Sequence, residues 1–264
     1  MTGFSRWTVL AAIGWLGTAA TSMAAGCQVH SLAHRVSVLE LYTSEGCSSC
    51  PPADRWLSAL PHRGIGTSMV IPLAFHVDYW NQLGWPDRFS QAGFSERQRR
   101  LNDRLKSGAI FTPQLLLDGR DLRLIGGMEK LQNTVAAANR QPSGAEIDLH
   151  VEPGTQGFAI TAEVLVAQTA LRPQAEAWIA VLENGLSSRV SHGENAGRQL
   201  YHDFVVRELI GPFALDRQGR AQIRQATHNS ADWNAANVHV AVLVQRKDTG
   251  EYLQAAVAPL ACRS

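Results

Sequence analysis

Apolar and polar positions follow different patterns in the two halves of the chain. Between residues 36 and 140, short β-branched and apolar runs alternate with longer stretches in which apolar residues recur at helical spacing. This order predicts two strand–helix units, then a hairpin, then a last helix. The expected strands span 36–42, 69–77, 115–117 and 122–125, and the expected helices span 51–60, 94–105 and 128–139.

The pattern changes after residues 141–144, where Gln-Pro-Ser-Gly combines turn formers without an apolar anchor and predicts a linker. Short, mostly alternating runs follow, separated by Gly, Pro, Asn or Asp. Their spacing favours an antiparallel β-sandwich of about seven strands over residues 145–262. The expected runs are 147–151, 158–166, 177–182, 200–209, 221–224 and 238–245.

The first residues have the layout of a signal peptide. Arg6 precedes an apolar run from Trp7 to Leu16, and small residues continue through Ala25. The run is shorter than the roughly 20 apolar residues that span a bilayer, and no later stretch reaches that length. We therefore predict that residues 1–24 are removed after export, that the mature protein is periplasmic or secreted, and that it has no membrane span.

Composition narrows the possible partners. With 45% hydrophobic and 18% charged residues and a formal net charge of +1, the chain is typical of globular proteins. A nucleic-acid-binding protein usually carries a basic stripe, and only short clusters such as Arg97, Arg99 and Arg100 occur. These arginines are interpreted as a solvated helix face, and no nucleic-acid partner is expected.

The four cysteines fall into a close pair and two distant residues. In an oxidising compartment, Cys27 and Cys262 are expected to form a disulfide that closes a very long loop and restricts the unfolded chain. The rival interpretation is a lipoprotein signal, because Ala24-Ala25-Gly26 precedes Cys27 as in a lipid-attachment site. Sequence alone does not fix the pairing, so both alternatives stay open.

Cys47 and Cys50 form a Cys-x-x-Cys pair between a predicted strand and a predicted helix. That spacing allows a disulfide, and the positive end of a helix favours a thiolate. We predict Cys47 as the nucleophile and Cys50 as the resolving thiol of an exchange that passes through a mixed disulfide. The order of elements around the pair is the plan of the thioredoxin fold. No cofactor and no metal site are predicted, since neither a glycine-rich nucleotide motif in the required context nor a second Cys-x-x-Cys occurs.

Thr112 and Pro113 precede the predicted hairpin. A cis peptide bond is accessible before proline, and such a bond at this place could hold a backbone edge beside the sulfur atoms, where a substrate strand would pair. Tyr79 and Trp80 are candidates for an aromatic wall facing that substrate, with a packed loop as the alternative. An ordinary trans proline at the start of a strand is the other possibility for Pro113.

Three further side chains are candidates for supporting the thiol chemistry. Glu40, on the strand before the cysteines, could move protons between the thiols if it is buried. His76 and Asp78 end the second predicted strand, where an imidazole could stabilise the Cys47 thiolate. Each of them has a structural alternative in a salt bridge or a buried hydrogen bond.

A polar cluster in the second half offers either a partner-binding loop or a solvated loop with internal hydrogen bonds. It has no cysteine, no recognised metal spacing and no nucleophile–base pair. Its residues are His192, Glu194, Asn195, Arg198, His202 and Asp203.

Several of these segments together carry a family resemblance. The run VLELYTSEGCSSCPPAD at 38–54 resembles the opening motif of a bacterial family of secreted thioredoxin-like proteins catalogued as domain of unknown function 1223. Further matches are HVDYW at 76–80, TPQ at 112–114, GEN at 193–195, HD at 202–203 and VVREL at 205–209. The resemblance covers nearly the whole mature chain and implies a thioredoxin-like fold, but it transfers little function. Cys27 and Cys262 lie outside its motifs.

Three functions fit this sequence. The first is an extracytoplasmic thiol–disulfide oxidoreductase that acts on protein thiols and is recycled by an unknown redox partner. The second is a copper-binding or delivery module, in which Cys47, Cys50 and His76 would hold Cu(I). The third is a secreted binding protein without catalysis, in which the Cys47–Cys50 bridge is structural.

Overall fold

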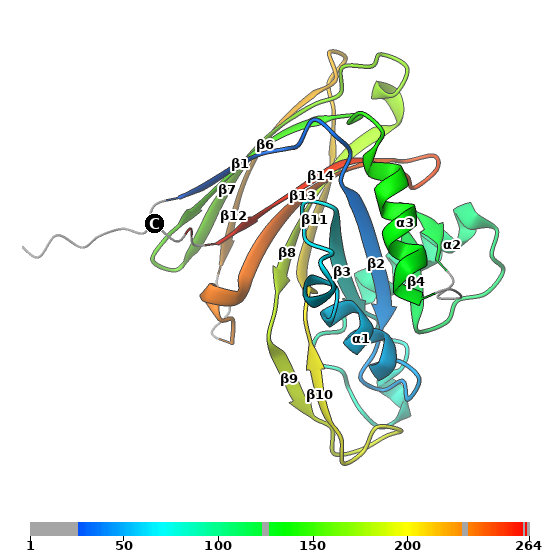
Figure 1. Ribbon diagram of the computed structural model, residues 1–264. Helices are drawn as coiled ribbons and strands as arrows, with labels where there is room; N and C mark the ends of the chain where they lie inside the picture. Colours follow the sequence, from blue (N-terminus) through cyan, green and yellow to red (C-terminus); the bar gives the residue numbers. More distant parts are fainter. Residues whose placement is uncertain (1–25, 123–126, 229–231, 261, 263–264) are drawn as a thin grey trace, which may run out of the picture.

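The computed structural model describes residues 26–122, 127–228, 232–260 and 262 (Figure 1), so the predicted signal peptide lies outside the described residues. The helices are α1 (Pro51–Ser58), α2 (Ala92–Leu105) and α3 (Gly127–Asn139). The strands of the first half are β1 (Cys27–His30), β2 (Ser37–Thr43), β3 (Val70–His76), β4 (Gln114–Leu117) and β5 (Arg120–Asp121). The strands of the second half are β6 (Glu146–Pro153), β7 (Gly157–Leu165), β8 (Ala175–Glu183), β9 (Leu186–Arg189), β10 (Gln199–His202), β11 (Val205–Ala214), β12 (Arg220–His228), β13 (Val238–Arg246) and β14 (Tyr252–Pro259).

One large mixed sheet joins both halves of the chain. Its strand order is β14-β13-β8-β11-β3-β2-β4-β5, with β2, β3 and β11 parallel and the other neighbours antiparallel. The junction lies where Val205 of β11 pairs with Ala74 of β3, and the amide of Ala74 donates to the carbonyl of Phe204 at 2.8 Å. The sheet therefore continues across the linker at 141–144, and the division into units 36–140 and 145–262 stays a prediction.

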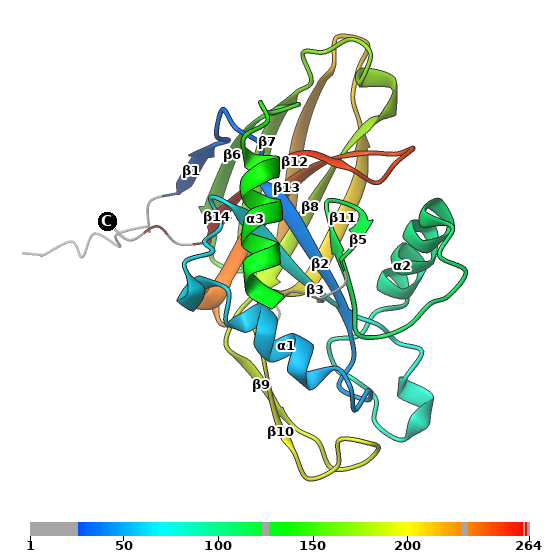
Figure 2. The same cartoon turned by 45° about the vertical axis from the view of Figure 1, so that its right-hand side comes forward.

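The helices lie on both faces of the large sheet (Figure 2). Leu57 of α1 and Val135 of α3 share a buried cluster with Leu41 of β2. Alternate residues of the strands point to the opposite face, where Phe94 of α2 packs in a cluster with Trp178 of β8. The mixed part of the sheet is thus enclosed between α1 and α3 on one side and α2 on the other.

A second sheet, of order β1-β6-β7-β12, packs against the antiparallel strands of the large sheet. Val151 and Ile160 from this sheet share one core with Val181 of β8 and Val242 of β13. These strands alternate buried and exposed positions, as expected for a sheet with one solvated face. The second half of the chain contributes strands to both layers of this core.

Local details differ from the sequence-based expectation at several places. The run 200–209 is divided between β10 and β11, because Phe204 adopts a left-handed backbone conformation with φ of 58° and interrupts the strand. The return strand after the 118–119 turn is β5, two residues long, instead of 122–125, of which residues 123–125 lie outside the described residues. Strands β1, β9 and β14 come from segments that the sequence pattern did not single out.

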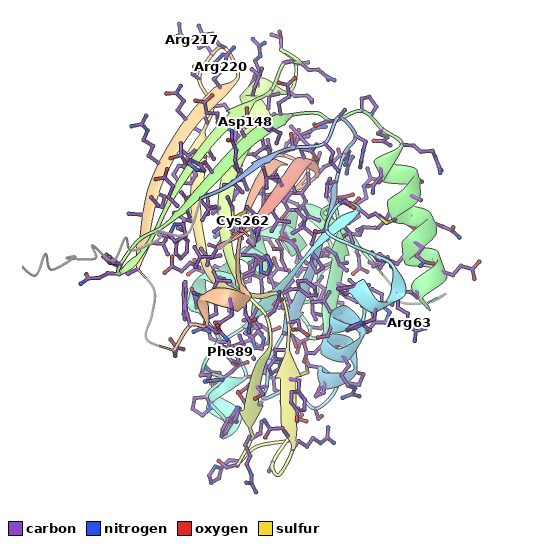
Figure 3. All side chains as sticks on the ribbon, turned by 60° about the vertical axis from the view of Figure 1, so that its left-hand side comes forward. Arg63, Phe89, Asp148, Arg217, Arg220 and Cys262 are labelled. Carbon is purple, nitrogen blue, oxygen red and sulfur yellow. A yellow bond between two sulfur atoms is a disulfide. The ribbon has the colours of Figure 1, made fainter. Side chains whose placement is uncertain are left out.

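Cys27 and Cys262 are joined by a disulfide, with their Cα atoms 5.4 Å apart (Figure 3 labels Cys262). Cys27 is buried at the start of β1, whose four residues pair with β6. The sulfur of Cys27 is therefore engaged in this structure and is not free to carry a lipid. In the described part of the chain no helix is both long and apolar enough to cross a membrane.

Candidate functional site

The Cys-x-x-Cys pair lies in the turn between β2 and α1. Cys47 and Cys50 form a disulfide, and the amide of Cys50 donates to the carbonyl of Cys47 at 3.2 Å. Cys50 is the N-cap of α1 and Pro51 opens the helix, where its missing N–H group leaves no hydrogen bond unmade. The helix begins at Pro51, as expected, and Cys47 lies in the turn before it.

Both cysteines are fully buried, with 0% of their surface exposed, whereas Ser48 and Ser49 between them are exposed. The hydroxyl of Ser49 lies 3.3 Å from the sulfur of Cys47. A thiolate must reach a sulfur atom to exchange with a disulfide. The segments that bury these two cysteines therefore control whether exchange can occur.

Part of that cover is the loop 190–198 at the tip of the β9–β10 hairpin. The side-chain amide of Asn195 donates to the carbonyls of Glu45 and Cys47, both at 2.9 Å, and Asn195 itself is fully buried. The carboxylate of Glu194 accepts a hydrogen bond from the amide of Ser48 at 3.0 Å. The polar cluster of the second half is thus brought onto the cysteine turn of the first half, and this loop is called the hairpin tip below.

The loop after β3 contacts the other side of the cysteine turn. A Cβ atom on Gly46 would lie 3.1 Å from the Cβ of Trp80, which is tighter than most contacts of this kind, so glycine suits the close approach of the two segments. The indole N–H of Trp80 donates to the hydroxyl of Thr112 at 2.8 Å, and the Thr112–Pro113 peptide bond is cis. Trp80 therefore connects the cysteine turn to the residues before β4.

Pro113 and Tyr79 are the sequence neighbours of Thr112 and Trp80, which are joined by this hydrogen bond. Pro113 lines a cavity of about 560 Å³ together with Ala53, whose amide donates to the carbonyl of Cys50. The phenol of Tyr79 donates to Gln98 of α2 at 3.1 Å. Pro113 thus lies beside the first turn of α1, whereas Tyr79 contacts α2.

Behind the cysteine turn lies a buried cluster of three carboxylates and two imidazoles. His76 and Asp87 are 2.6 Å apart, and His202 contacts Glu45 at 3.1 Å and Asp54 at 3.9 Å. The two imidazole rings meet edge to face with their centroids 4.9 Å apart. The cluster links α1, β3 and the hairpin strand β10 directly beneath the disulfide turn.

Burial and pairing shift the pKa values of this cluster in opposite directions. Burial raises the pKa of Asp54, and the nearby imidazoles only partly offset this effect. Burial lowers the pKa of His76, but the attraction of Asp87 outweighs it and the pKa lies above its usual value. Burial raises the pKa of Asp87 and of Glu45, but hydrogen bonds and the imidazoles bring both below the usual value.

Glu40 and Asp78 have other partners. Glu40 is fully buried and contacts the guanidinium of Arg97 at 2.6 Å and the hydroxyl of Tyr252 at 2.7 Å. Asp78 accepts a hydrogen bond from Ser95 of α2 at 2.5 Å. None of the contacts described for Glu40, Asp78 or His76 reaches either cysteine. These three residues, expected to support the thiol chemistry, are therefore not in direct contact with the disulfide.

The sequence did not identify Glu45, Asp54 and Asp87 as members of the site. Glu45 precedes Cys47 by two residues, and Asp54 follows Cys50 by four. The spacing of one helical turn after Cys50 could have identified Asp54. Asp87 carried no local signal, since it lies in a loop and approaches only through the tertiary fold. Within the described residues, no group of three or more His, Cys, Asp or Glu side chains is arranged to hold a metal ion.

Two solved structures are similar to this chain. One is a structural-genomics protein from Agrobacterium tumefaciens, with 22% identity, a TM-score of 0.64, and coverage of 87% of this chain and 97% of that chain. The other is HBP35 of Porphyromonas gingivalis, with 16% identity, a TM-score of 0.65, and coverage of 87% of this chain and 76% of that chain. At these identities the likeness shows a shared fold alone. No curated protein matches the chain.

A family model described as "Protein of unknown function (DUF1223)" matches residues 38–245. The match includes the cysteine turn, the loop after β3, the cis-proline segment and the hairpin tip. It confirms the resemblance of the sequence motifs. Because the match spans well over half of the chain, this protein belongs to the DUF1223 family.

Proposed function

We propose that this protein is an exported thioredoxin-like protein whose Cys47–Cys50 pair exchanges disulfides with protein thiols. The observation that carries the proposal is the disulfide at the junction of β2 and α1, within strands ordered β3-β2-β4-β5. In this unit β2 and β3 are parallel, β4 is antiparallel, and helices lie on both faces. Strand order, helix placement and cysteine position together support the thioredoxin-like assignment.

The exchange balances without a cofactor. In the reduced protein, the Cys47 thiolate attacks a substrate disulfide, forms a mixed disulfide and releases one substrate thiolate. The Cys50 thiolate then attacks the sulfur of Cys47, which forms the Cys47–Cys50 bond and releases the second substrate thiolate. Two electrons pass from the protein to the substrate, and the reverse sequence oxidises a substrate dithiol. The N-terminus of α1 beside both sulfurs favours the thiolate forms.

Exchange requires that the hairpin tip move away from the cysteine turn. With both cysteines fully buried, an incoming thiolate has no direct path to the Cys47 sulfur. The tip is held by the side chains of Asn195 and Glu194, and these hydrogen bonds can break without disturbing the cores of the two sheets. We therefore place the access step at the hairpin tip.

A second candidate is a secreted binding protein in which the Cys47–Cys50 bond is only structural. The complete burial of both cysteines favours it, because structural disulfides resist thiols whereas catalytic ones are exposed to them. The two candidates differ in whether the bond opens under physiological reductants.

The deciding experiment is the equilibrium reduction potential of Cys47–Cys50 in the mature protein, measured in glutathione buffers with Cys47→Ser as the control. Exchange activity predicts a reversible potential between about −120 and −270 mV. A potential below about −300 mV with slow reduction overturns the proposal and establishes the structural bond. Insulin reduction, followed by turbidity, tests catalysis on a protein disulfide directly.

Export is tested separately. Residues 1–24 are proposed to direct the chain across the cytoplasmic membrane, with the mature protein starting at Ala25. Mass spectrometry of the protein purified from a periplasmic extract should give that N-terminus and two fewer hydrogens per disulfide. A full-length chain in the cytoplasmic fraction would contradict the proposal.

A further inference from the structure

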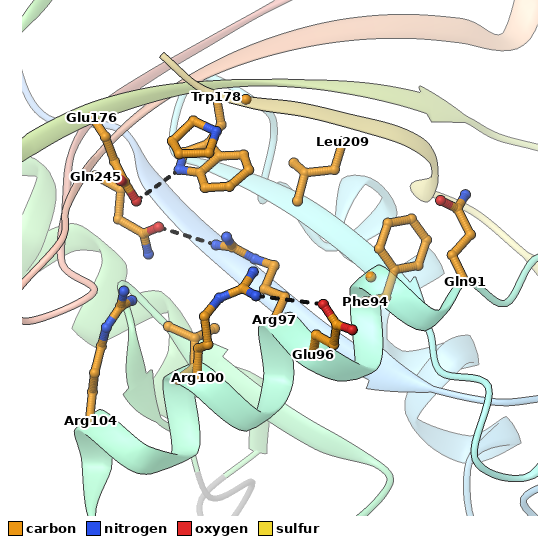
Figure 4. Close-up of a pocket in the computed structure, with 14 residues that line it drawn as sticks. Gln91, Phe94, Glu96, Arg97, Arg100, Arg104, Glu176, Trp178, Leu209 and Gln245 are labelled. Carbon is orange, nitrogen blue, oxygen red and sulfur yellow. Dashed lines mark hydrogen bonds and ion pairs between the residues drawn. The ribbon is translucent and has the colours of Figure 1, made fainter. Parts of the chain in front are cut away.

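A cavity lies between α2 and the antiparallel strands of the large sheet, on the face opposite α1 and α3 (Figure 4). Its volume is about 540 Å³, within the range of about 300–1,000 Å³ that is usual for small-molecule sites. One wall is formed by α2, and the other by residues of β8, β11 and β13. The cavity does not include the cysteines or the hairpin tip.

The helix wall presents a row of arginines. Arg97, Arg100 and Arg104 lie three and four residues apart on one face of α2, and all three line the cavity. The charge of Arg97 is compensated by the buried Glu40, whereas Glu96 approaches Arg100 only at 3.9 Å. Within the described part of the chain, Arg104 has no ion-pair partner. Two like charges four residues apart destabilise a helix unless an anion lies near them.

The sheet wall is mainly apolar. Trp178 and Leu209 line it, and the indole N–H of Trp178 already donates to Glu176 at 3.1 Å. The indole is 8% exposed and the guanidinium of Arg97 lies over its ring, so only a small part of its carbon surface reaches the cavity. The backbone of Gly211 lies so close to this ring that a Cβ atom there would be 3.0 Å from Cε3 of Trp178, and its φ of 131° also suits glycine. A glycine at 211 thus leaves the indole in place as the wall.

We propose that this cavity binds an organic anion, a carboxylate with a flat apolar body. The carboxylate would lie between Arg100 and Arg104, since planar guanidinium groups pair with carboxylates through two hydrogen bonds. The apolar body would lie against Leu209, Pro212 and the part of Trp178 that reaches the cavity. Glu176, on the sheet side, would repel an anion, which fixes the orientation with the charge toward the helix.

The test uses 2-naphthoate as the probe and isothermal titration calorimetry on the mature, oxidised protein. The double variant Arg100→Gln, Arg104→Gln removes the two cavity charges. Arg99→Gln is the matched control, because Arg99 is an exposed arginine of the same helix that does not line the cavity. A third variant, Cys47→Ser, separates this site from the thiol chemistry.

We expect 2-naphthoate to bind at least tenfold more tightly than acetate, which lacks the apolar body, and than 2-naphthalenemethanol, which lacks the charge. The double variant should weaken binding at least tenfold, while Arg99→Gln and Cys47→Ser change it less than twofold. The absence of binding at millimolar 2-naphthoate overturns the proposal. So does an equal loss in Arg99→Gln, which would indicate general attraction to a basic helix.

Discussion

The side-chain amide of Asn195 donates to the backbone carbonyl of Cys47 at 2.9 Å, across 148 positions of sequence. The same amide also donates to the carbonyl of Glu45. A single buried side chain from the second half of the chain therefore fixes the backbone on which the disulfide turn is built. Access to the disulfide and the position of the β9–β10 hairpin are coupled through this residue.

Replacing Asn195 with Ala should speed reduction of the Cys47–Cys50 bond. The substitution removes two hydrogen bonds, each contributing about 0.5–1.5 kcal/mol, so opening of the tip should become easier by roughly fivefold or more. The rate is measured by quenching dithiothreitol reduction with an alkylating reagent and counting modified cysteines. Tyr201→Ala is the control on the same hairpin, since Tyr201 is 67% exposed. Equal rates in the wild type and Asn195→Ala would show that the tip does not limit access.

Replacing Glu194 with Gln should lower the pKa of Cys47 in the reduced protein. Glu194 places a carboxylate on the amide of Ser48, next to the sulfur that becomes negatively charged. Removing that charge favours the thiolate, although the effect is modest because Glu194 is exposed. The measurement is the pH dependence of iodoacetamide alkylation, with Glu129→Gln on α3 as the control. A Cys47 pKa that rises or stays fixed would contradict this role.

Thermal stability should decline as pH rises above about 6.5 because of His76. The pKa of His76 is raised in the folded protein, so its stabilising contribution is complete below the unfolded value and is lost as pH rises through the folded value. The pKa of Asp87 is lowered, so its contribution is present above about 3.8 and is lost in acid. The pKa of Asp54 is raised, so its contribution is present below about 3.8 and is lost as pH rises through its folded value.

The measurement for this prediction is the Tm between pH 4 and pH 9. The wild type should be most stable on the acid side of neutrality. His76→Gln should have a lower Tm at every pH and a flatter alkaline slope. An unchanged slope in this variant would assign the decline to other groups.

Replacing Arg97 with Ala should destabilise the protein by about 3–5 kcal/mol, because it leaves the buried carboxylate of Glu40 without its partner. Arg99→Ala, at an exposed position of the same helix, should change the free energy of unfolding by less than about 0.5 kcal/mol. The double variant Glu40→Ala, Arg97→Ala should lose less free energy of unfolding than the sum of the losses in the two single variants. Urea unfolding provides all four values, and additive losses would disprove the coupling.

The sequence predicted those parts of the fold that depend on local pattern. The helix expected at 94–105 is α2 at Ala92–Leu105, and the strand expected at 69–77 is β3 at Val70–His76. Periodicity could not predict that β11 pairs with β3, because this pairing joins strands more than a hundred residues apart. Only the tertiary structure therefore reveals that both halves of the chain share one sheet.

The same limit applies to the candidate site. The Cys-x-x-Cys pair and the Thr112–Pro113 segment carried recognisable spacing and were identified. Glu40 was a candidate for proton transfer because of its place on the strand before the cysteines, but its carboxylate pairs with Arg97 instead. The sequence pattern placed Arg97 on a solvated helix face, whereas it is buried. The contact of Asn195 with Cys47 depends on how a distant hairpin folds back, which no local pattern records.

The bond between Cys27 and Cys262 makes the backbone between these residues a closed covalent ring. One cut by a protease at an exposed turn, such as that at 247–249, would open the ring without releasing a fragment. The nicked protein would migrate as one species until a reductant separated the two pieces. Because Cys262 is exposed while Cys47 and Cys50 are buried, the ring should open to added thiols before the cysteine turn does.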